Sequence, residues 1–89
     1  MSGQRIVFVG SKPLSAYVLA IVQMYQNADD ENPTVHVQAR GRWIGKAIVA
    51  SHLAQKLIPL KMKDVKVEVE KFKTEKGERL VPKLTITLC

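Results

Sequence analysis

Two short cationic segments, each containing a glycine, are the part of this sequence best suited to chemistry. The first is the Gly-Ser-Lys-Pro stretch at residues 10–13, and the second is the Arg-Gly-Arg stretch at 40–42, with Lys46 shortly after it. Lysine and arginine neutralise phosphate groups, and glycine lets a phosphate approach the backbone closely. Both segments therefore predict contacts with a phosphate-bearing ligand.

Nucleophilic and metal chemistry have little support elsewhere in the chain. His36 and His52 fall in different predicted elements, and neither has a carboxylate partner close in sequence. Cys89 is the single cysteine and the last residue, and no spacing of histidines or cysteines matches a metal site. We expect no catalytic residue, no metal and no cofactor, so the protein is not predicted to be an enzyme.

Length and composition predict one folded domain over residues 1–89. Hydrophobic residues make up 46% of the chain and charged residues 25%, as in ordinary globular proteins. No apolar run approaches the length of about 20 residues that spans a bilayer, and no signal peptide is expected at the start. A single cysteine fits a reducing compartment. We therefore expect a cytoplasmic protein without a membrane segment.

Positive charge is abundant and unevenly distributed. The formal net charge is +6 and the sequence pI is about 9.7, which favours a polyanionic partner. Residues 32–63 contain no acidic residue, whereas Asp29, Asp30 and Glu31 lie just before them. The six basic residues of this stretch are Arg40, Arg42, Lys46, Lys56, Lys61 and Lys63. Charge is thus segregated along the chain.

The hydrophobic pattern predicts a strand–helix–strand–helix–strand–strand order. Alternating apolar residues or short continuous runs indicate strands, and apolar residues three or four apart indicate helices. Predicted strands cover Arg5–Val9, Thr34–Arg40, Lys63–Phe72 and Val81–Cys89, and predicted helices cover Pro13–Asn27 and Trp43–Ile58. The charged stretch Lys73–Leu80, which contains Gly77, is predicted to be a hairpin loop.

This order of elements gathers the cationic segments at one edge of the predicted sheet. A strand–helix–strand unit is usually parallel and right-handed, so the first three strands are expected to run in one direction. The segments that follow them, including the hairpin at 71–79, then leave the sheet at its carboxyl edge, where ligands of α/β sheets bind. The second helix begins there among arginines rather than acids, an arrangement that suits a bound anion. The residues expected at this site are Gly10, Ser11, Lys12, Arg40, Gly41, Arg42 and Lys46.

Each of these features also has an ordinary structural explanation. Lys12 could be a solvated loop lysine, residues 40–42 could be a plain connection, and the hairpin could be a solvated tip. Trp43 could stack on a sugar or base, but packing against a neighbouring element is the preferred interpretation, as it is for Tyr17 and Tyr25. The convergence of three basic segments on one edge is what favours an anion-binding surface.

The chain resembles the Alba family of archaeal chromatin proteins at three places. These are Val9–Leu14, Tyr17–Ala20 and above all Ala39–Ala47, whose Ala-Arg-Gly-Arg stretch is followed by Ile-x-Lys-Ala. The resemblance implies an α+β fold of two layers, with a mixed four-stranded sheet and two helices on one face. That fold is similar to the C-terminal domain of translation initiation factor three.

The resemblance also implies a function and a set of contacts. Family members form dimers that span double-stranded DNA with little sequence preference, and many also bind RNA. By resemblance, Lys12 matches a backbone-binding lysine, and Arg40 and Arg42 match an arginine pair. A projecting hairpin arm at residues 71–80 is expected to follow the minor groove. Its expected contacts are Lys71, Lys73, Lys76 and Arg79.

Two positions depart from the family pattern. Ser11 stands where the family often has a lysine that is acetylated, so regulation by acetylation at that position is not expected. Leu57 stands where the family often has a phenylalanine that packs one dimer against another along DNA. Cooperative coating is therefore expected to be altered, or to need a paralogue as heterodimer partner.

Three interpretations of function remain open at this level. The first is an archaeal chromosome-associated protein that coats or condenses DNA as a homodimer or heterodimer. The second is an RNA-binding ribonucleoprotein component or RNA chaperone with the same fold, which charge and topology do not separate from the first. The third is an interaction module whose charge serves solubility alone.

Overall fold

A computed structural model describes residues 5–28 and 33–89 of the chain. The acidic cluster of Asp29, Asp30 and Glu31 lies outside the described residues, as do Met1–Gln4. In chain order the elements are β1 (Arg5–Val9), α1 (Leu14–Gln26), β2 (Val35–Arg40), the 3-10 turn η1 (Gly41–Trp43), α2 (Ile44–Leu57), β3 (Met62–Thr74) and β4 (Gly77–Leu88). The predicted βαβαββ order is confirmed.

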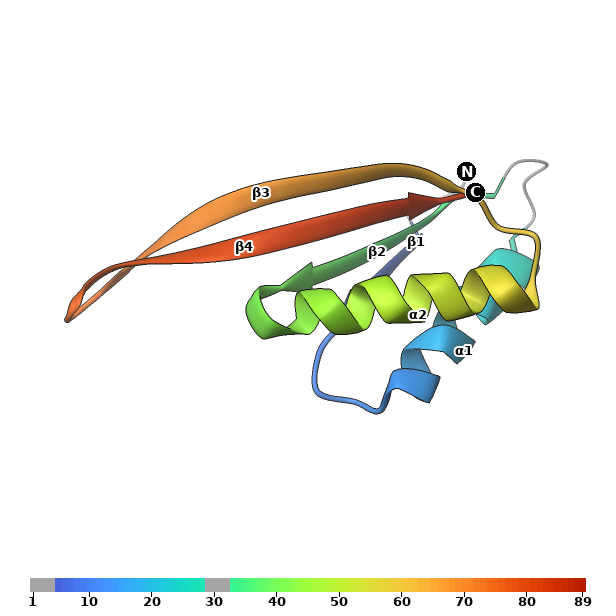
Figure 1. Ribbon diagram of the computed structural model, residues 1–89, viewed down its shortest axis with the longest axis horizontal. Helices are drawn as coiled ribbons and strands as arrows, with labels where there is room; N and C mark the ends of the chain where they lie inside the picture. The colour runs from blue at the N-terminus through green and yellow to red at the C-terminus, as the bar shows by residue number, and fades with distance from the viewer. Residues whose placement is uncertain (1–4, 29–32) are drawn as a thin grey trace.

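The four strands form one mixed sheet in the order β1-β2-β4-β3. β1 pairs with β2 in parallel, and β4 is antiparallel to both of its neighbours, β2 and β3. The strands β1, β2 and β3 therefore run in the same direction and end at the same edge, although β4 separates β2 from β3. Both helices cover one face of this sheet (Figure 1). The predicted α+β fold is thus confirmed.

The hydrophobic core lies between the helices and one face of the sheet. Every second residue of the central strands points into it, as the alternating sequence requires. The helices contribute the buried Tyr17 and Ile21 from α1 and three alanines from α2, whose small side chains let the helix backbone approach the sheet. The buried hydrophobic residues are Val7, Val9, Tyr17, Ile21, Val35, Val37, Ala39, Ala47, Ala50, Ala54, Leu60, Leu84, Ile86 and Leu88.

The β3–β4 hairpin extends well past the helices (Figure 1). The predicted loop at Lys73–Leu80 is wrong, because the strands stay paired up to a turn of two residues, Glu75 and Lys76. Many charges and one glycine suggested a loop, yet solvent-exposed strands tolerate charged side chains on both faces. Gly77 has a φ of +124°, a conformation that suits glycine, and as the first residue of β4 it lets the chain enter the strand directly from the turn.

One face of β3 carries valines that no helix covers. Val65, Val67 and Val69 pair with residues of β4 on the helix side of the sheet, yet α2 packs above β2 and β4 and stops short of β3. Their exposed fractions are 47%, 64% and 62%. An uncovered row of β-branched apolar residues is unusual for an isolated subunit.

Candidate nucleic-acid interface

The loop after β1 is held by side chains from both helices. The Tyr17 hydroxyl on α1 accepts hydrogen bonds from the backbone N–H groups of Gly10 and Lys12, each at 2.9 Å. Tyr17 is buried, so this acceptor is fixed by the core. The Lys12 side chain is exposed at the outer surface of the loop.

The arginine turn connects β2 to α2 at the same edge. Gly41 adopts a φ of +58°, in the left-handed region that favours glycine, and this conformation turns the chain from strand into η1. Residues 41–57 contain no acidic residue, so α2 supplies no carboxylate of its own to balance its positive end. Arg42 is exposed, and its guanidinium lies 4.5 Å from the centroid of the Trp43 ring.

Lys46 joins the two segments. Its ammonium donates hydrogen bonds to the carbonyl oxygens of Gly10 and Lys12, at 3.0 and 2.9 Å. The same nitrogen lies 4.7 Å from the centroid of the Trp43 ring, and the Arg42 guanidinium also lies over this ring. We call the surface formed by residues 10–13, residues 40–43 and Lys46 the cationic corner.

Arg40 has an acidic partner that the sequence did not predict. Its Nε donates a hydrogen bond to Oε1 of Glu70 on β3 at 2.6 Å. Glu70 lies two strands away, and only the insertion of β4 between β2 and β3, with its register, brings it opposite Arg40. The contact lowers the net positive charge around Arg40, whereas Lys12 and Arg42 are exposed at the corner.

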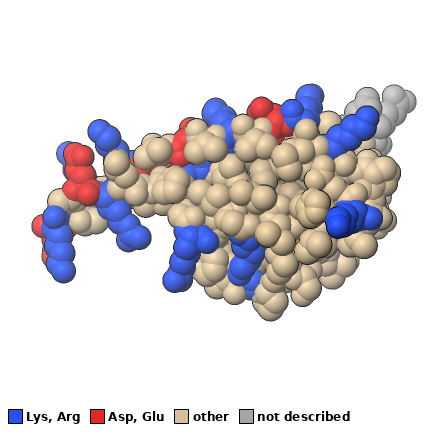
Figure 2. Space-filling model, viewed as in Figure 1, with Lys and Arg blue, Asp and Glu red and all other residues tan. Residues whose placement is uncertain are grey.

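The arm, residues 71–80, carries the remaining predicted contacts. All of its residues are exposed, and it lies outward from the cationic corner rather than against it (Figure 1). Figure 2 shows lysine and arginine side chains along the hairpin and below its base, near the beginning of α2. Glu75 and Glu78 are interspersed with them. The basic residues of the arm are Lys71, Lys73, Lys76 and Arg79.

Known proteins resemble this chain over nearly its full length, although no family model matches it. The "DNA/RNA-binding protein Alba" of Thermoplasma acidophilum is 37% identical over 99% of this chain and 98% of its own length. This chain belongs to the Alba family. The Alba of Methanothrix thermoacetophila is 34% identical with the same coverage of both chains. The family membership predicted from the sequence is confirmed.

Solved Alba structures share the fold. Alba from Thermoplasma volcanium superimposes with a TM-score of 0.82 at 34% identity, covering 94% of this chain and 98% of that one. ALBA1 from Trypanosoma brucei gives a TM-score of 0.76 at 16% identity, covering 99% of this chain and 70% of that one. This second comparison supports the fold alone.

The two positions that were expected to differ from the Alba pattern are both on the surface. Ser11 is exposed in the loop of the cationic corner. Leu57 is 67% exposed at the end of α2, and it lines an apolar groove of about 720 Å³ between α1 and α2. Leu14, Val18 and Leu53 line the same groove. The predicted dimer–dimer contact of Leu57 remains a prediction.

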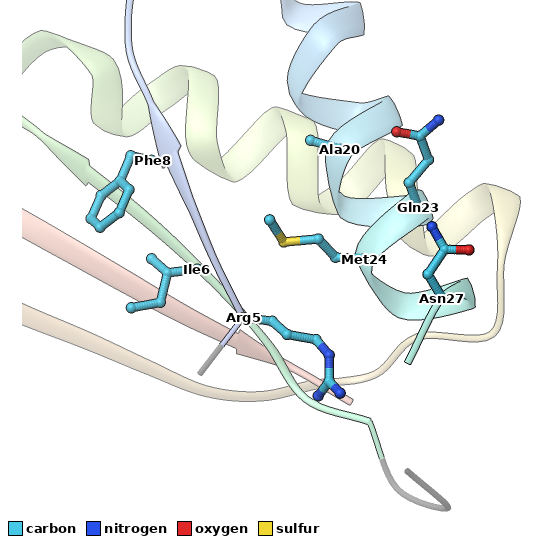
Figure 3. A pocket seen from close by; sticks show the side chains of 7 residues that line it. All are labelled: Arg5, Ile6, Phe8, Ala20, Gln23, Met24 and Asn27. Carbon is cyan, nitrogen blue, oxygen red and sulfur yellow. The ribbon is translucent and has the colours of Figure 1, made fainter. Parts of the chain in front are cut away.

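Other surfaces of this Alba-family chain offer less for a phosphate ligand. Figure 3 shows the residues that line a pocket between β1 and α1: Met24 points from α1 toward β1, whereas Ile6 and Phe8 point away from α1. The pocket has a volume of about 650 Å³, and Arg5 lies at one end of it. His36 bonds to the hydroxyl of Thr87 at 3.1 Å on the open sheet face. Within residues 5–28 and 33–89, no group of three or more histidine, cysteine or acidic side chains is placed to hold a metal. No described helix is long and apolar enough to cross a membrane.

Proposed function

We propose that this chain binds double-stranded DNA through the phosphate backbone without sequence preference, and that it also binds RNA. The observation that carries the proposal is the cationic corner, in which Lys46 ties the loop of Lys12 to the turn of Arg42. The printed names of Alba relatives, "DNA/RNA-binding protein", support the same class of ligand.

Binding needs no chemical step. Phosphate oxygens accept charge-assisted hydrogen bonds from Lys12 and Arg42, and the neutralised phosphates release their condensed counterions. The partial positive charge at the beginning of α2 acts in the same direction because the first turn of this helix carries no acidic side chain. Such contacts position a protein on a duplex but do not read its bases, so any sequence is accepted.

The arm extends the proposed contact along the duplex. Residues 1–89 act as one domain, and the ribbon at 71–80 follows the minor groove with its basic side chains toward the phosphates. Support comes from the length of the hairpin beyond the helices and from its exposure on both faces. The alternating glutamates Glu75 and Glu78 limit the charge at the tip, so we expect the arm to contribute less than the cationic corner.

The binding unit is proposed to be a dimer. The uncovered valines of β3 supply an apolar surface that a second subunit would bury, and Leu80 continues this surface at 59% exposure. A dimer would present two cationic corners and two arms to one duplex. The partner is either a second copy of this chain or a paralogue.

In the cell the proposed dimer is cytoplasmic and associated with the chromosome, which it coats or compacts. An RNA-centred role is the second candidate, because the relatives' names include RNA and the same backbone contacts serve both ligands. Competition between duplex DNA and structured RNA at one salt concentration separates the two roles. We propose no catalytic activity for either role.

Arg42→Ala tests the phosphate-backbone mechanism. We expect affinity to fall by about tenfold or more on every duplex, since one charge-assisted hydrogen bond is lost from each subunit. Fluorescence anisotropy with three duplexes of unrelated sequence measures the change. Lys61→Ala, which removes one charge just before β3 and beside Cys89, serves as the control and is expected to weaken binding much less. A loss confined to one of the three duplexes would refute backbone-only recognition.

A further inference from the structure

Four hydrogen bonds from two side chains hold the backbone of the loop at residues 10–12. We propose that Tyr17 and Lys46 form a loop clamp, defined by these bonds, that positions Lys12 for phosphate binding, and that Lys46 acts through this clamp rather than at a phosphate itself. The inference rests on the proposed function and assigns different roles to two lysines of one cationic surface.

Tyr17 supplies the rigid half of the clamp. Backbone N–H groups in an exposed loop ordinarily bond to water, but here those of Gly10 and Lys12 converge on one phenol oxygen. The Tyr17 ring is only 7% exposed, so the oxygen is held by the packing of α1 against the sheet. Because these two donors are occupied, the Lys12 ammonium is the cationic group that this loop offers to a phosphate.

Lys46 supplies the second half. Two of its three ammonium protons go to the carbonyl oxygens of Gly10 and Lys12. Its nitrogen also lies over the rings of Trp43 and Tyr17, at 4.7 and 5.8 Å from their centroids. Carbonyl dipoles and ring faces thus stabilise this cation within the protein, which leaves one proton for an outside ligand. Lys46 is half-buried, whereas Lys12 is exposed.

The clamp also ties the loop to α2. Lys46 is on the first turn of this helix, so its two hydrogen bonds connect the loop after β1 to the element that follows the arginine turn. A loop held at both its N–H and its C=O groups loses little conformational entropy when a phosphate binds. Loosening the clamp is therefore expected to weaken binding without removing a contact to the ligand.

Amide hydrogen exchange tests the clamp without any nucleic acid. Tyr17→Phe keeps the ring in the core and removes the shared acceptor. We expect the exchange rates of the Gly10 and Lys12 amides to rise at least about threefold, as for the loss of a hydrogen bond of ordinary strength. Tyr25→Phe, which removes the other tyrosine hydroxyl of α1, is the matched control. Unchanged rates at Gly10 and Lys12 in Tyr17→Phe would overturn the clamp.

A double-mutant cycle on duplex affinity tests its role. Lys46→Met keeps the aliphatic stem and removes the donors, and Lys61→Met makes the same change of net charge outside the cationic corner, just before β3. In the wild-type background, we expect Lys46→Met to weaken binding several-fold more than Lys61→Met does. In a Lys12→Ala background, we expect the two substitutions to weaken binding to the same small extent. Thermal melting confirms that the variants are folded.

Two other results have distinct meanings. If Lys46→Met costs the same factor with and without Lys12, then Lys46 contacts phosphate directly and the proposal is overturned. If the wild-type chain binds neither duplex DNA nor RNA, the proposed function fails and the positioning role fails with it, whereas the exchange experiment still decides whether the clamp exists.

Discussion

Arg40 and Arg42 are two residues apart, yet they differ in what faces them. Arg42 lies over the Trp43 ring at the exposed start of α2, whereas Arg40 donates to Glu70. A phosphate that contacts Arg40 must compete with this carboxylate. The two arginines, which the sequence presented as a pair, are therefore expected to contribute unequally to binding.

Neutralising Glu70 is expected to strengthen nucleic-acid binding. Glu70→Gln frees the Arg40 guanidinium and removes a negative charge near the cationic corner, so affinity for duplex DNA should rise about two- to fivefold, as expected for an exposed ion pair. Isothermal calorimetry at moderate salt measures the change. Asp64→Asn makes the same charge change at the other end of β3. Equal gains from both variants would show that only net charge matters.

At the scale of residues, the sequence predicted that basic side chains gather at one edge of the sheet, but it did not predict the partners that these side chains have within the protein. Lys12 and Arg42 are recognisable because each lies in a short glycine-containing segment between a predicted strand and a predicted helix. The contact of Lys46 with the loop depends on α2 beginning close to the loop after β1, and the contact of Arg40 with Glu70 depends on strand order. Neither follows from spacing along the chain.

Among the elements, α2 packs its smallest residues against the sheet, and one of them is polar. Ser51 is fully buried between Ala47, Ala50 and Ala54, and its hydroxyl has no hydrogen-bond partner among the described residues. A buried hydroxyl without a partner costs free energy relative to a methyl group.

Ser51→Ala is expected to stabilise the fold. Removal of the unsatisfied hydroxyl and the better helix propensity of alanine should raise the free energy of unfolding by about 1 kcal/mol. For a domain of this size that corresponds to an increase in Tm of about 4–8 °C. Differential scanning calorimetry measures it, with the exposed Ser15→Ala on α1 as the control. A lower Tm would mean that the hydroxyl does satisfy a hydrogen bond.

The helices and strands were predicted correctly where the hydrophobic periodicity was strong, and the prediction failed where charged residues interrupted that periodicity. The strand Arg5–Val9 was predicted with its observed bounds, and both helices were placed to within a residue or two. The hairpin was misplaced because Lys73–Thr74 and Gly77–Leu80 carry no apolar alternation, and their pairing comes from the strands that precede and follow them. Backbone hydrogen bonds between the two paired strands keep such residues in the sheet, whatever their side chains are.

The whole molecule has an apolar surface that its own helices leave uncovered. The sequence predicted the alternation of Val65, Val67 and Val69, but not that α2 would cover β2 and β4 and leave β3 bare. That outcome depends on where β4 inserts in the sheet, which is a property of the complete fold. The exposed valines motivate the proposed dimer.

Val67→Glu tests this surface. A carboxylate at the centre of an apolar interface would lose its hydration, so we expect the variant to sediment as a monomer at concentrations where the wild-type chain is dimeric. Lys66→Glu places the same side chain on the opposite face of β3 and should leave the dimer intact. Identical sedimentation of Val67→Glu and the wild-type chain would exclude this face as the interface.

Salt dependence tests the central claim, that the molecule binds nucleic acid through phosphate neutralisation by the cationic corner. The affinity of the wild-type chain is measured for two duplexes of unrelated sequence across a range of potassium chloride concentrations. For a dimer that neutralises about six phosphates, the plot of log affinity against log salt should have a slope of about −5, the same for both duplexes. An affinity that does not change with salt, or slopes that differ between the two sequences, would contradict it.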